Sequence, residues 1–107
     1  MITLEEAQQR SAERIYPRVT KESIEARIKL VRYMVDKPLT VCIIEMQNGF
    51  RVIGKAAPAD ERNYDQDVGQ RYAYEDAFKQ IWQFEGYLLC ERLTSEPKTL
   101  QVVKDPQ

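Results

Sequence analysis

The Asn48-Gly49 dipeptide is the feature that most constrains the fold of this sequence. It separates two runs rich in β-branched and other apolar residues, 41–46 and 50–54. Asn-Gly is typical of a two-residue type I′ turn, because Asn tolerates a positive φ and Gly adopts one without steric cost. The sequence therefore predicts an antiparallel hairpin in which Gln47 pairs with Phe50 and Val41 pairs with Ala56.

Both faces of this predicted hairpin carry apolar side chains. One face holds Val41, Ile43, Phe50 and Val52, and the other holds Cys42, Ile44, Met46 and Ile53. A ribbon that is open to water on one side alternates apolar and polar residues more regularly than this. We therefore expect both faces to be covered, by the flanking helices or by a second subunit.

An isolated two-stranded hairpin is marginally stable in water, so further elements must support it. A candidate third strand near the C-terminus contains Leu100, Val102 and Val103. Without a third strand, the free edge of the hairpin would invite pairing with a copy of the same chain, which would make the protein a homodimer.

Two helices are predicted before the hairpin. A capping box at Thr3 and Glu6 predicts a helix over about residues 4–15, whose thin apolar stripe is typical of a surface arm. Thr20 caps a second predicted helix over about residues 20–36. In that segment the apolar residues Ile24, Ile28, Val31 and Val35 recur at helical spacing.

A long amphipathic helix is predicted after the hairpin. It is expected to start near Gln66, with Asn63 or Asp65 as its N-cap, and to bend or break at Gly86. Its apolar stripe contains Ala73, Ala77, Ile81, Phe84 and Leu88. The expected fold is therefore α+β: two N-terminal helices, a hairpin with a candidate third C-terminal strand, and a long C-terminal helix packed on it. The expected organisation is a helical arm (1–18), one domain (19–93) and a tail or short edge strand (94–107).

The residue types argue against an enzyme or a metal protein. The chain has no histidine and two cysteines, Cys42 and Cys90, whereas zinc sites need three or four Cys or His ligands. Both cysteines are expected to be buried apolar residues. No nucleophile has a visible base and no phosphate-binding loop is present, so we expect no catalytic residues and no cofactor. The N-terminus lacks the pattern of a signal peptide, and the default location is the cytoplasm.

One cluster of residues is compatible with ligand binding. Its members are four cations and two tyrosines near the loop that follows the hairpin, namely Arg51, Lys55, Arg62, Tyr64, Arg71 and Tyr72. The cations would attract an anion and the tyrosines would offer a stacking surface. Acidic residues at Asp60, Glu61, Asp65 and Asp67 crowd the same region and would repel a phosphate. A capped helix after a polar loop is the simpler interpretation.

Residues 39–93 resemble a small family of proteins from tailed bacteriophages and prophages, known from coliphage and Shigella phage genomes. The helical segment from Ser23 to Val35 fits the family's upstream helix, so the resemblance extends over about residues 20–93. The matching residues are Thr40-Val-Cys42, Asn48-Gly-Phe50, Val52, Gly54, Ala56-Ala57, Asn63-Tyr-Asp65, Val68-Gly69, Ala73, Ala77, Ile81-Trp82 and Glu85-Gly-Tyr-Leu88. The resemblance implies a phage or prophage accessory protein in a bacterial cytoplasm, and it supplies no catalytic residues.

The leading functional hypothesis is a non-enzymatic module that binds a host or phage protein, with a homodimer as one form. The first alternative is a small-ligand or nucleotide binder, such as a sponge for a bacterial defence signal. A weaker alternative is nucleic-acid binding through the basic residues of the 20–36 segment. The net charge of −1 argues against that last class, since nucleic-acid-binding domains are usually basic.

Overall fold

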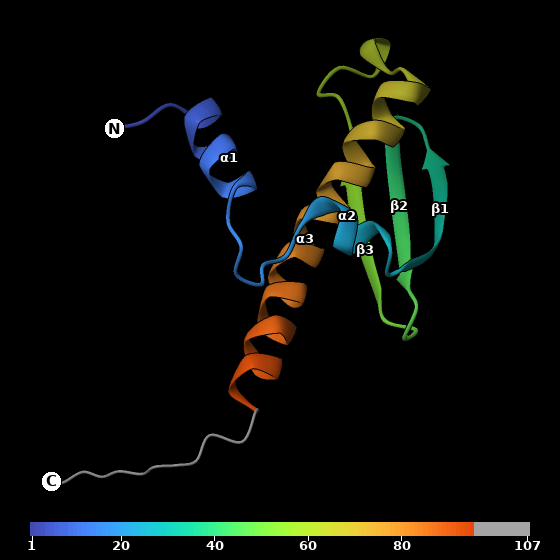
Figure 1. Ribbon diagram of the computed structural model, residues 1–107. Helices are drawn as coiled ribbons and strands as arrows, with labels where there is room; N and C mark the ends of the chain where they lie inside the picture. The colour runs from blue at the N-terminus through green and yellow to red at the C-terminus, as the bar shows by residue number, and fades with distance from the viewer. Residues whose placement is uncertain (96–107) are drawn as a thin grey trace, which may run out of the picture.

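The computed structural model of the protein describes residues 1–95 and has an α+β fold (Figure 1). Its elements in chain order are α1 (Leu4–Ala12), α2 (Lys21–Glu25), β1 (Ile28–Asp36), β2 (Leu39–Met46), β3 (Arg51–Ala56), a 3₁₀ turn η1 (Glu61–Asn63) and α3 (Gln66–Thr94). The three strands form one antiparallel sheet in the order β1-β2-β3. The expected fold class is confirmed.

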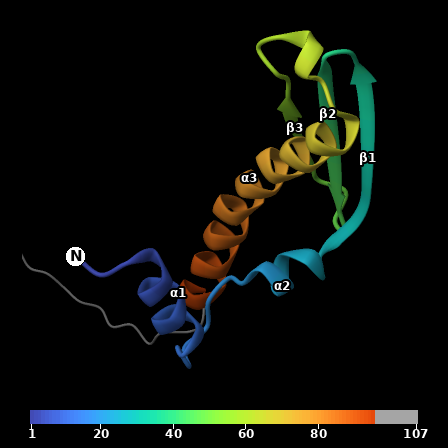
Figure 2. The same cartoon turned by 90° about the horizontal axis from the view of Figure 1, so that it is seen from above.

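The sheet and α3 form two layers. In both views α3 crosses one face of the sheet, and its second half continues beyond the strands (Figures 1 and 2). The capping box at Thr3 and Glu6 opens α1 as expected, and none of the residues in α1 is buried. This helix is therefore the surface arm that its thin apolar stripe predicts.

The predicted second helix over 20–36 is wrong beyond its first turn. Thr20 caps α2 as expected, but this helix ends at Glu25, and Ile28–Asp36 forms the edge strand β1. Val31, Tyr33 and Val35 alternate along β1 and lie opposite Ile44, Cys42 and Thr40. These β-branched and aromatic residues pack well on a pleated surface, and pairing with β2 overrides the helical spacing.

The third strand of the sheet therefore comes from the N-terminal side of the hairpin. A two-residue link, Lys37-Pro38, joins β1 to β2 and contains a cis peptide bond, as type VI turns do. The predicted third strand at Leu100, Val102 and Val103 lies outside the described residues.

The hairpin is present, but its predicted register is wrong by one residue. The loop has three residues, Gln47 to Gly49, and only Gly49 needs the positive φ of 90° that it shows. The amide of Gly49 donates to the carbonyl of Met46 (2.9 Å), and the amide of Met46 donates to the carbonyl of Phe50 (2.8 Å). Three-residue hairpin loops are commonly built this way, from a type I turn followed by a left-handed glycine.

The corrected register gives the sheet one buried face and one open face. Ile44 lies opposite Val52 and Cys42 opposite Gly54, so the buried positions of β2 and β3 share one face of the sheet. The one-residue correction exchanges the faces of the β3 side chains relative to β2. The open face still carries apolar side chains, namely Leu39, Val41, Ile43 and Ile53. Within the described chain, α3 covers one face only, so the flanking helices do not cover both faces. Coverage of the open face by a second subunit stays a prediction.

The core lies between this inward face and the first half of α3. Its members are Ile24, Cys42, Ile44, Met46, Val52, Ala73, Ala77, Phe78 and Ile81. Gly54 permits the closest approach: a Cβ atom there would lie 2.2 Å from the carbonyl oxygen of Ala73 and 2.3 Å from the amide nitrogen of Ala77. The small residues of β3 and α3 therefore set the distance between the two layers.

Helix α3 begins at Gln66 as expected. The carboxylate of its N-cap, Asp65, accepts from the amides of Asp67 (3.0 Å) and Val68 (3.2 Å). The expected break at Gly86 does not occur, because the helix continues through this residue to Thr94. Cys42 is buried as expected, whereas Cys90 is exposed, which corrects the expectation for the second cysteine.

Candidate functional site

The second half of α3 exposes an unusual number of large apolar side chains. The residues of α3 that are buried lie in its first sixteen positions and end at Ile81. Beyond them, the exposed large apolar residues are Trp82, Phe84, Tyr87, Leu88 and Leu93. A helix that is apolar on all sides normally has a second partner.

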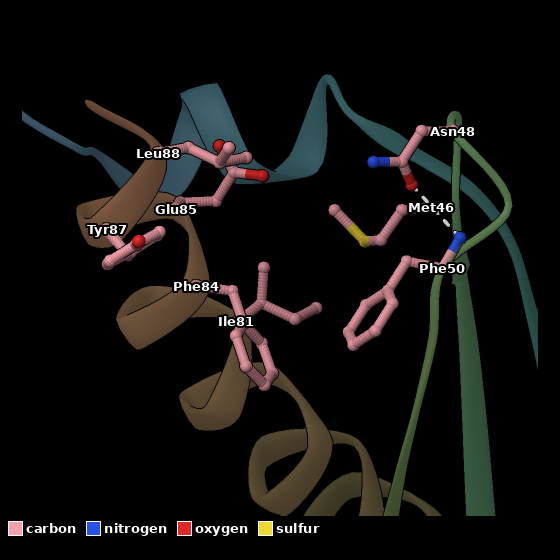
Figure 3. Close-up of a pocket in the computed structure, with 8 residues that line it drawn as sticks. All are labelled: Met46, Asn48, Phe50, Ile81, Phe84, Glu85, Tyr87 and Leu88. Atoms are coloured by element: carbon pink, nitrogen blue, oxygen red, sulfur yellow. Dashed lines mark hydrogen bonds between the residues drawn. The ribbon is translucent and has the colours of Figure 1, made fainter. Parts of the chain in front are cut away.

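An apolar groove lies between this part of α3 and the hairpin loop (Figure 3). It has a volume of about 230 Å³, and it is lined by Met46, Asn48, Phe50, Ile81, Phe84, Glu85, Tyr87 and Leu88. Met46 and Ile81 are buried and form its floor, whereas Phe50, Phe84 and Leu88 are 50 %, 47 % and 39 % exposed. The groove therefore presents half-buried aromatic and aliphatic walls to the solvent.

An aromatic pair joins the two sides of the groove. The rings of Phe50 and Phe84 lie 5.1 Å apart at an interplanar angle of 76°. This is the edge-to-face geometry that aromatic pairs prefer, and it fixes the distance between the hairpin loop and the helix. The side chain of Asn48 accepts from the amide of Phe50 (3.0 Å), so the loop residue that carries this ring is held in place.

Polar contacts anchor the rim of the groove. The guanidinium of Arg27 donates to the carboxylate of Glu85 (2.8 Å), whose side chain is 13 % exposed. The carbonyl of Arg27 accepts from the amide of Gln47 (2.8 Å). The segment between α2 and β1 thus ties the hairpin loop to α3 and keeps the groove preformed.

The chemistry of the groove is that of apolar contact. Its one carboxylate, on Glu85, is already paired with Arg27. Burial raises the pKa of the Cys42 thiol, and a buried thiol with a raised pKa is a poor nucleophile. Within residues 1–95, no three His, Cys, Asp or Glu side chains are grouped so that they could hold a metal ion.

The six residues singled out from the sequence do not form one site. Three of the cations pair locally: Arg51 with Glu45 (3.6 Å), Arg62 with Asp60 (2.6 Å) and Arg71 with Glu75 (2.5 Å). Hydrogen bonds from Arg62 lower the pKa of Asp60. Lys55 and Arg51 project from the open face of β3, on the side of the sheet opposite α3.

Only Tyr64 and Tyr72 of the six come together. They line a second cavity of about 280 Å³ between the Ala56-Ala57-Pro58 loop and the start of α3. The hydroxyls of Tyr64 and of the nearby Thr40 are buried without a hydrogen-bond partner in the described chain. The amides at the start of α3 are already bonded by Asp65, so they are not free to bind an anion.

The groove was not recognised in the sequence. Phe84 and Leu88 continue the apolar stripe of Ala73, Ala77 and Ile81, and this spacing does not indicate where the sheet ends. The length of α3 carries the signal: 29 residues at 1.5 Å each span about 44 Å, whereas the eight-residue strand β2 spans about 26 Å. Part of such a helix must extend beyond the sheet.

The model of the Phage protein (N4 Gp49/phage Sf6 gene 66) family matches residues 19–93 of the chain. The chain belongs to this family. The assignment confirms the resemblance noted from the sequence. No curated protein and no solved structure is significantly similar to the chain.

The residues that the family model matches include the three strands, nearly all of α3 and every residue that lines the groove. The arm α1 lies before it. Among the described helices, none combines the length and apolar character needed to cross a bilayer.

Proposed function

We propose that this phage-family protein is a non-enzymatic accessory protein that binds another protein in the host cytoplasm through the groove beside α3. The observation that carries the proposal is the solvent-exposed wall of Phe50, Phe84 and Leu88 above a buried apolar floor. Exposed apolar patches that are rimmed by polar residues mark interaction surfaces in soluble proteins.

The shape of the groove suits the apolar face of a partner's helix. Phe84 and Leu88 are one turn apart on α3, so their exposed sides form a continuous apolar strip along the helix axis. Amphipathic helices bind such strips with apolar residues at i, i+3, i+4 and i+7. Complete burial of a Phe or Leu side chain is worth about 1.5–3 kcal/mol, so three half-exposed side chains would supply several kcal/mol of binding energy.

A pair of variants on α3 tests this proposal. Phe84 and Val68 are both 47 % exposed, but only Phe84 lines the groove. Tagged wild-type protein, F84S and V68S are used to capture partners from infected bacteria, and each captured protein is purified and titrated by calorimetry. F84S is expected to weaken binding at least about tenfold, while V68S binds as the wild type does. Equal affinities for F84S and wild type would refute the groove as the contact surface.

A second candidate function is the binding of a small ligand in the cavity beside Tyr64 and Tyr72. The unpartnered hydroxyls of Tyr64 and Thr40 favour it, since buried polar groups normally have a partner. Thermal-shift measurements with cyclic and linear nucleotides test this function, because a ligand that binds the native state raises the melting temperature. An unchanged melting temperature with every nucleotide would refute this second candidate function.

The weaker alternative, nucleic-acid binding, loses its structural basis. Residues 28–36 form a strand and not a basic helix, and Arg27 and Lys29 pair with Glu85 and Glu45. If the protein did bind nucleic acid, its affinity would fall steeply with salt concentration.

The proposed function includes self-association as a homodimer. Support comes from β1, an edge strand in which Leu30, Tyr33, Met34 and Val35 are all exposed. A long apolar edge strand is a template for pairing with another chain.

A further inference from the structure

The two edges of the sheet are treated differently by the rest of the chain. On the β3 edge, the amide of Lys55 donates to the carboxylate of Asp76 (2.9 Å), and the side chain of Gln80 donates to the carbonyl of Ile53 (2.7 Å). Side chains of α3 thus occupy two of the backbone groups that face away from β2. These two bonds obstruct the pairing of a further strand with the β3 edge.

The same pattern identifies the free groups of β1. The backbone N–H and C=O groups of Ile53 and Lys55 point away from β2, so the even-numbered residues of β3 form the hydrogen bonds to β2. Their partners in β2 are also even-numbered, which leaves the odd-numbered residues of β2 to bond to β1. The register then leaves Val31, Tyr33 and Val35 with backbone groups that point outward. Among residues 1–95, no side chain or backbone group is bonded to these positions from outside the sheet, and no element lies beyond β1 in either view (Figures 1 and 2).

Two charged residues of this edge strand have no ion-pair partner among residues 1–95. Arg32 and Asp36 lie opposite Ile43 and Leu39, so both project from the open face of the sheet. Neither forms an ion pair with another described residue. They are four residues apart on one strand, about 13 Å, which is too far for them to pair within the chain.

We infer that β1 pairs antiparallel with β1 of a second copy about a two-fold axis through Met34, so that Arg32 of each copy faces Asp36 of the other. The inference rests on the proposed homodimer and specifies its interface. In this register Tyr33 pairs with Val35 of the second copy, both through their outward backbone groups. The three strands of each copy then form one continuous six-stranded sheet.

Charge selects this register over its neighbours. The two-fold axis must pass through a residue. An axis between two residues would place a residue whose backbone groups face the second copy opposite one whose backbone groups face β2. An axis through Arg32 would place Arg32 opposite itself, and like charges opposite each other are destabilising. An axis through Tyr33 would leave Asp36 facing Leu30. Only the axis through Met34 pairs both charges with their opposites, and it does so twice by symmetry.

Charge-reversal variants test this interface in the full chain. Sedimentation equilibrium is measured for the wild type, R32D, D36R and the double variant R32D/D36R, with R18D as a control that has the same charge change away from the sheet. Each single reversal replaces two attractive contacts by two repulsive ones, so we expect the dissociation constant of the dimer to rise at least about tenfold. The double variant restores the opposite charges and is expected to dimerise within about threefold of the wild type.

Cross-linking tests the register directly. In a C90S background, which removes the exposed cysteine, M34C places two thiols on the two-fold axis. Facing residues of this kind have Cα atoms about 4.5 Å apart, within the range of a disulfide. The control L30C, on the same face of β1, faces Pro38 of the second copy and is expected not to cross-link.

The outcomes separate the interface from the homodimer itself. A wild type that is monomeric at all concentrations refutes both. A wild-type dimer that the single reversals leave unchanged, or that L30C cross-links as readily as M34C, refutes the β1 interface and leaves dimerisation through another surface. Folding of each variant is checked by circular dichroism. Binding to the groove partner is measured separately with F84S, so its failure does not bear on this interface.

Discussion

Replacement of Gly54 by alanine is expected to destabilise the protein strongly, because this residue sets the separation of the two layers. The added Cβ would lie 2.2 Å from the carbonyl oxygen of Ala73 and 2.3 Å from the amide nitrogen of Ala77. Both atoms belong to the backbone of α3, so no side-chain rotation can relieve the contact. Ordinary contact begins near 3.4 Å, so the helix and the strand must move apart by on the order of 1 Å.

The cost of this movement can be estimated from the core. A radial gap of 0.5–1 Å loses roughly a quarter to a half of the dispersion energy of each contact across it. The residues of α3 that would lose contacts are Ala73, Ala77, Phe78 and Ile81. We expect a loss of at least about 3 kcal/mol, a large part of the 5–15 kcal/mol by which a domain is usually stable. The melting temperature should fall by on the order of 12 °C.

Urea denaturation followed by circular dichroism measures this loss. The matched control is Gly86→Ala in α3, where an added Cβ meets nothing within 4 Å. Since glycine in a helix interior is less stable than alanine by about 0.5–1 kcal/mol, G86A should be more stable than the wild type. The double variant G54A/A77G should not recover stability, because the closest atoms are backbone. A loss below about 1 kcal/mol for G54A would refute the reasoning.

Two further predictions concern the edge of β3 and the arm. The hydrogen bond from the Lys55 amide lowers the pKa of Asp76. The Asp76 carboxylate therefore stabilises the folded protein above its unfolded pKa of about 4. This stabilisation is lost as the pH falls through the lower pKa that Asp76 has in the folded protein. D76N should lower the free energy of unfolding by about 0.5–1 kcal/mol at pH 7. It should also make this free energy depend less on pH at acidic values, as measured by urea titration from pH 2 to 7. Deletion of residues 1–18 should change the melting temperature, measured by calorimetry, by less than about 2 °C, because α1 has no buried residue; a larger fall would show that the arm packs on the domain.

The features that could be predicted from the sequence are those fixed by local chemistry. Capping residues at Thr3 and Thr20, and the alternatives Asn63 and Asp65, mark the starts of the three α-helices described in residues 1–95. The stripe of small and apolar residues identifies the buried part of α3. These signals act within a few residues along the chain, so they need no knowledge of the tertiary structure.

The errors arose where tertiary contacts decide between two local solutions. The apolar residues of 28–35 satisfy both a helical and a strand pattern, and only the pairing of β1 with β2 selects the strand. The hairpin loop could close with two or three residues, and the choice moves Val52 from one face to the other. The groove depends on both outcomes, because the hairpin loop must lie beside α3 before Phe50 and Phe84 can meet.

The bonds from Asp76 and Gln80 to β3 have a consequence for assembly. A chain with two open strand edges can add neighbours without limit, and the product is a filament. Within residues 1–95 the sheet has one edge obstructed by α3 and one open edge, so strand pairing between copies of this sheet would end when two open edges meet. Helix α3 thereby caps the growth of the sheet as well as covering its core, and the loss of those two side chains would turn a terminating assembly into a propagating one.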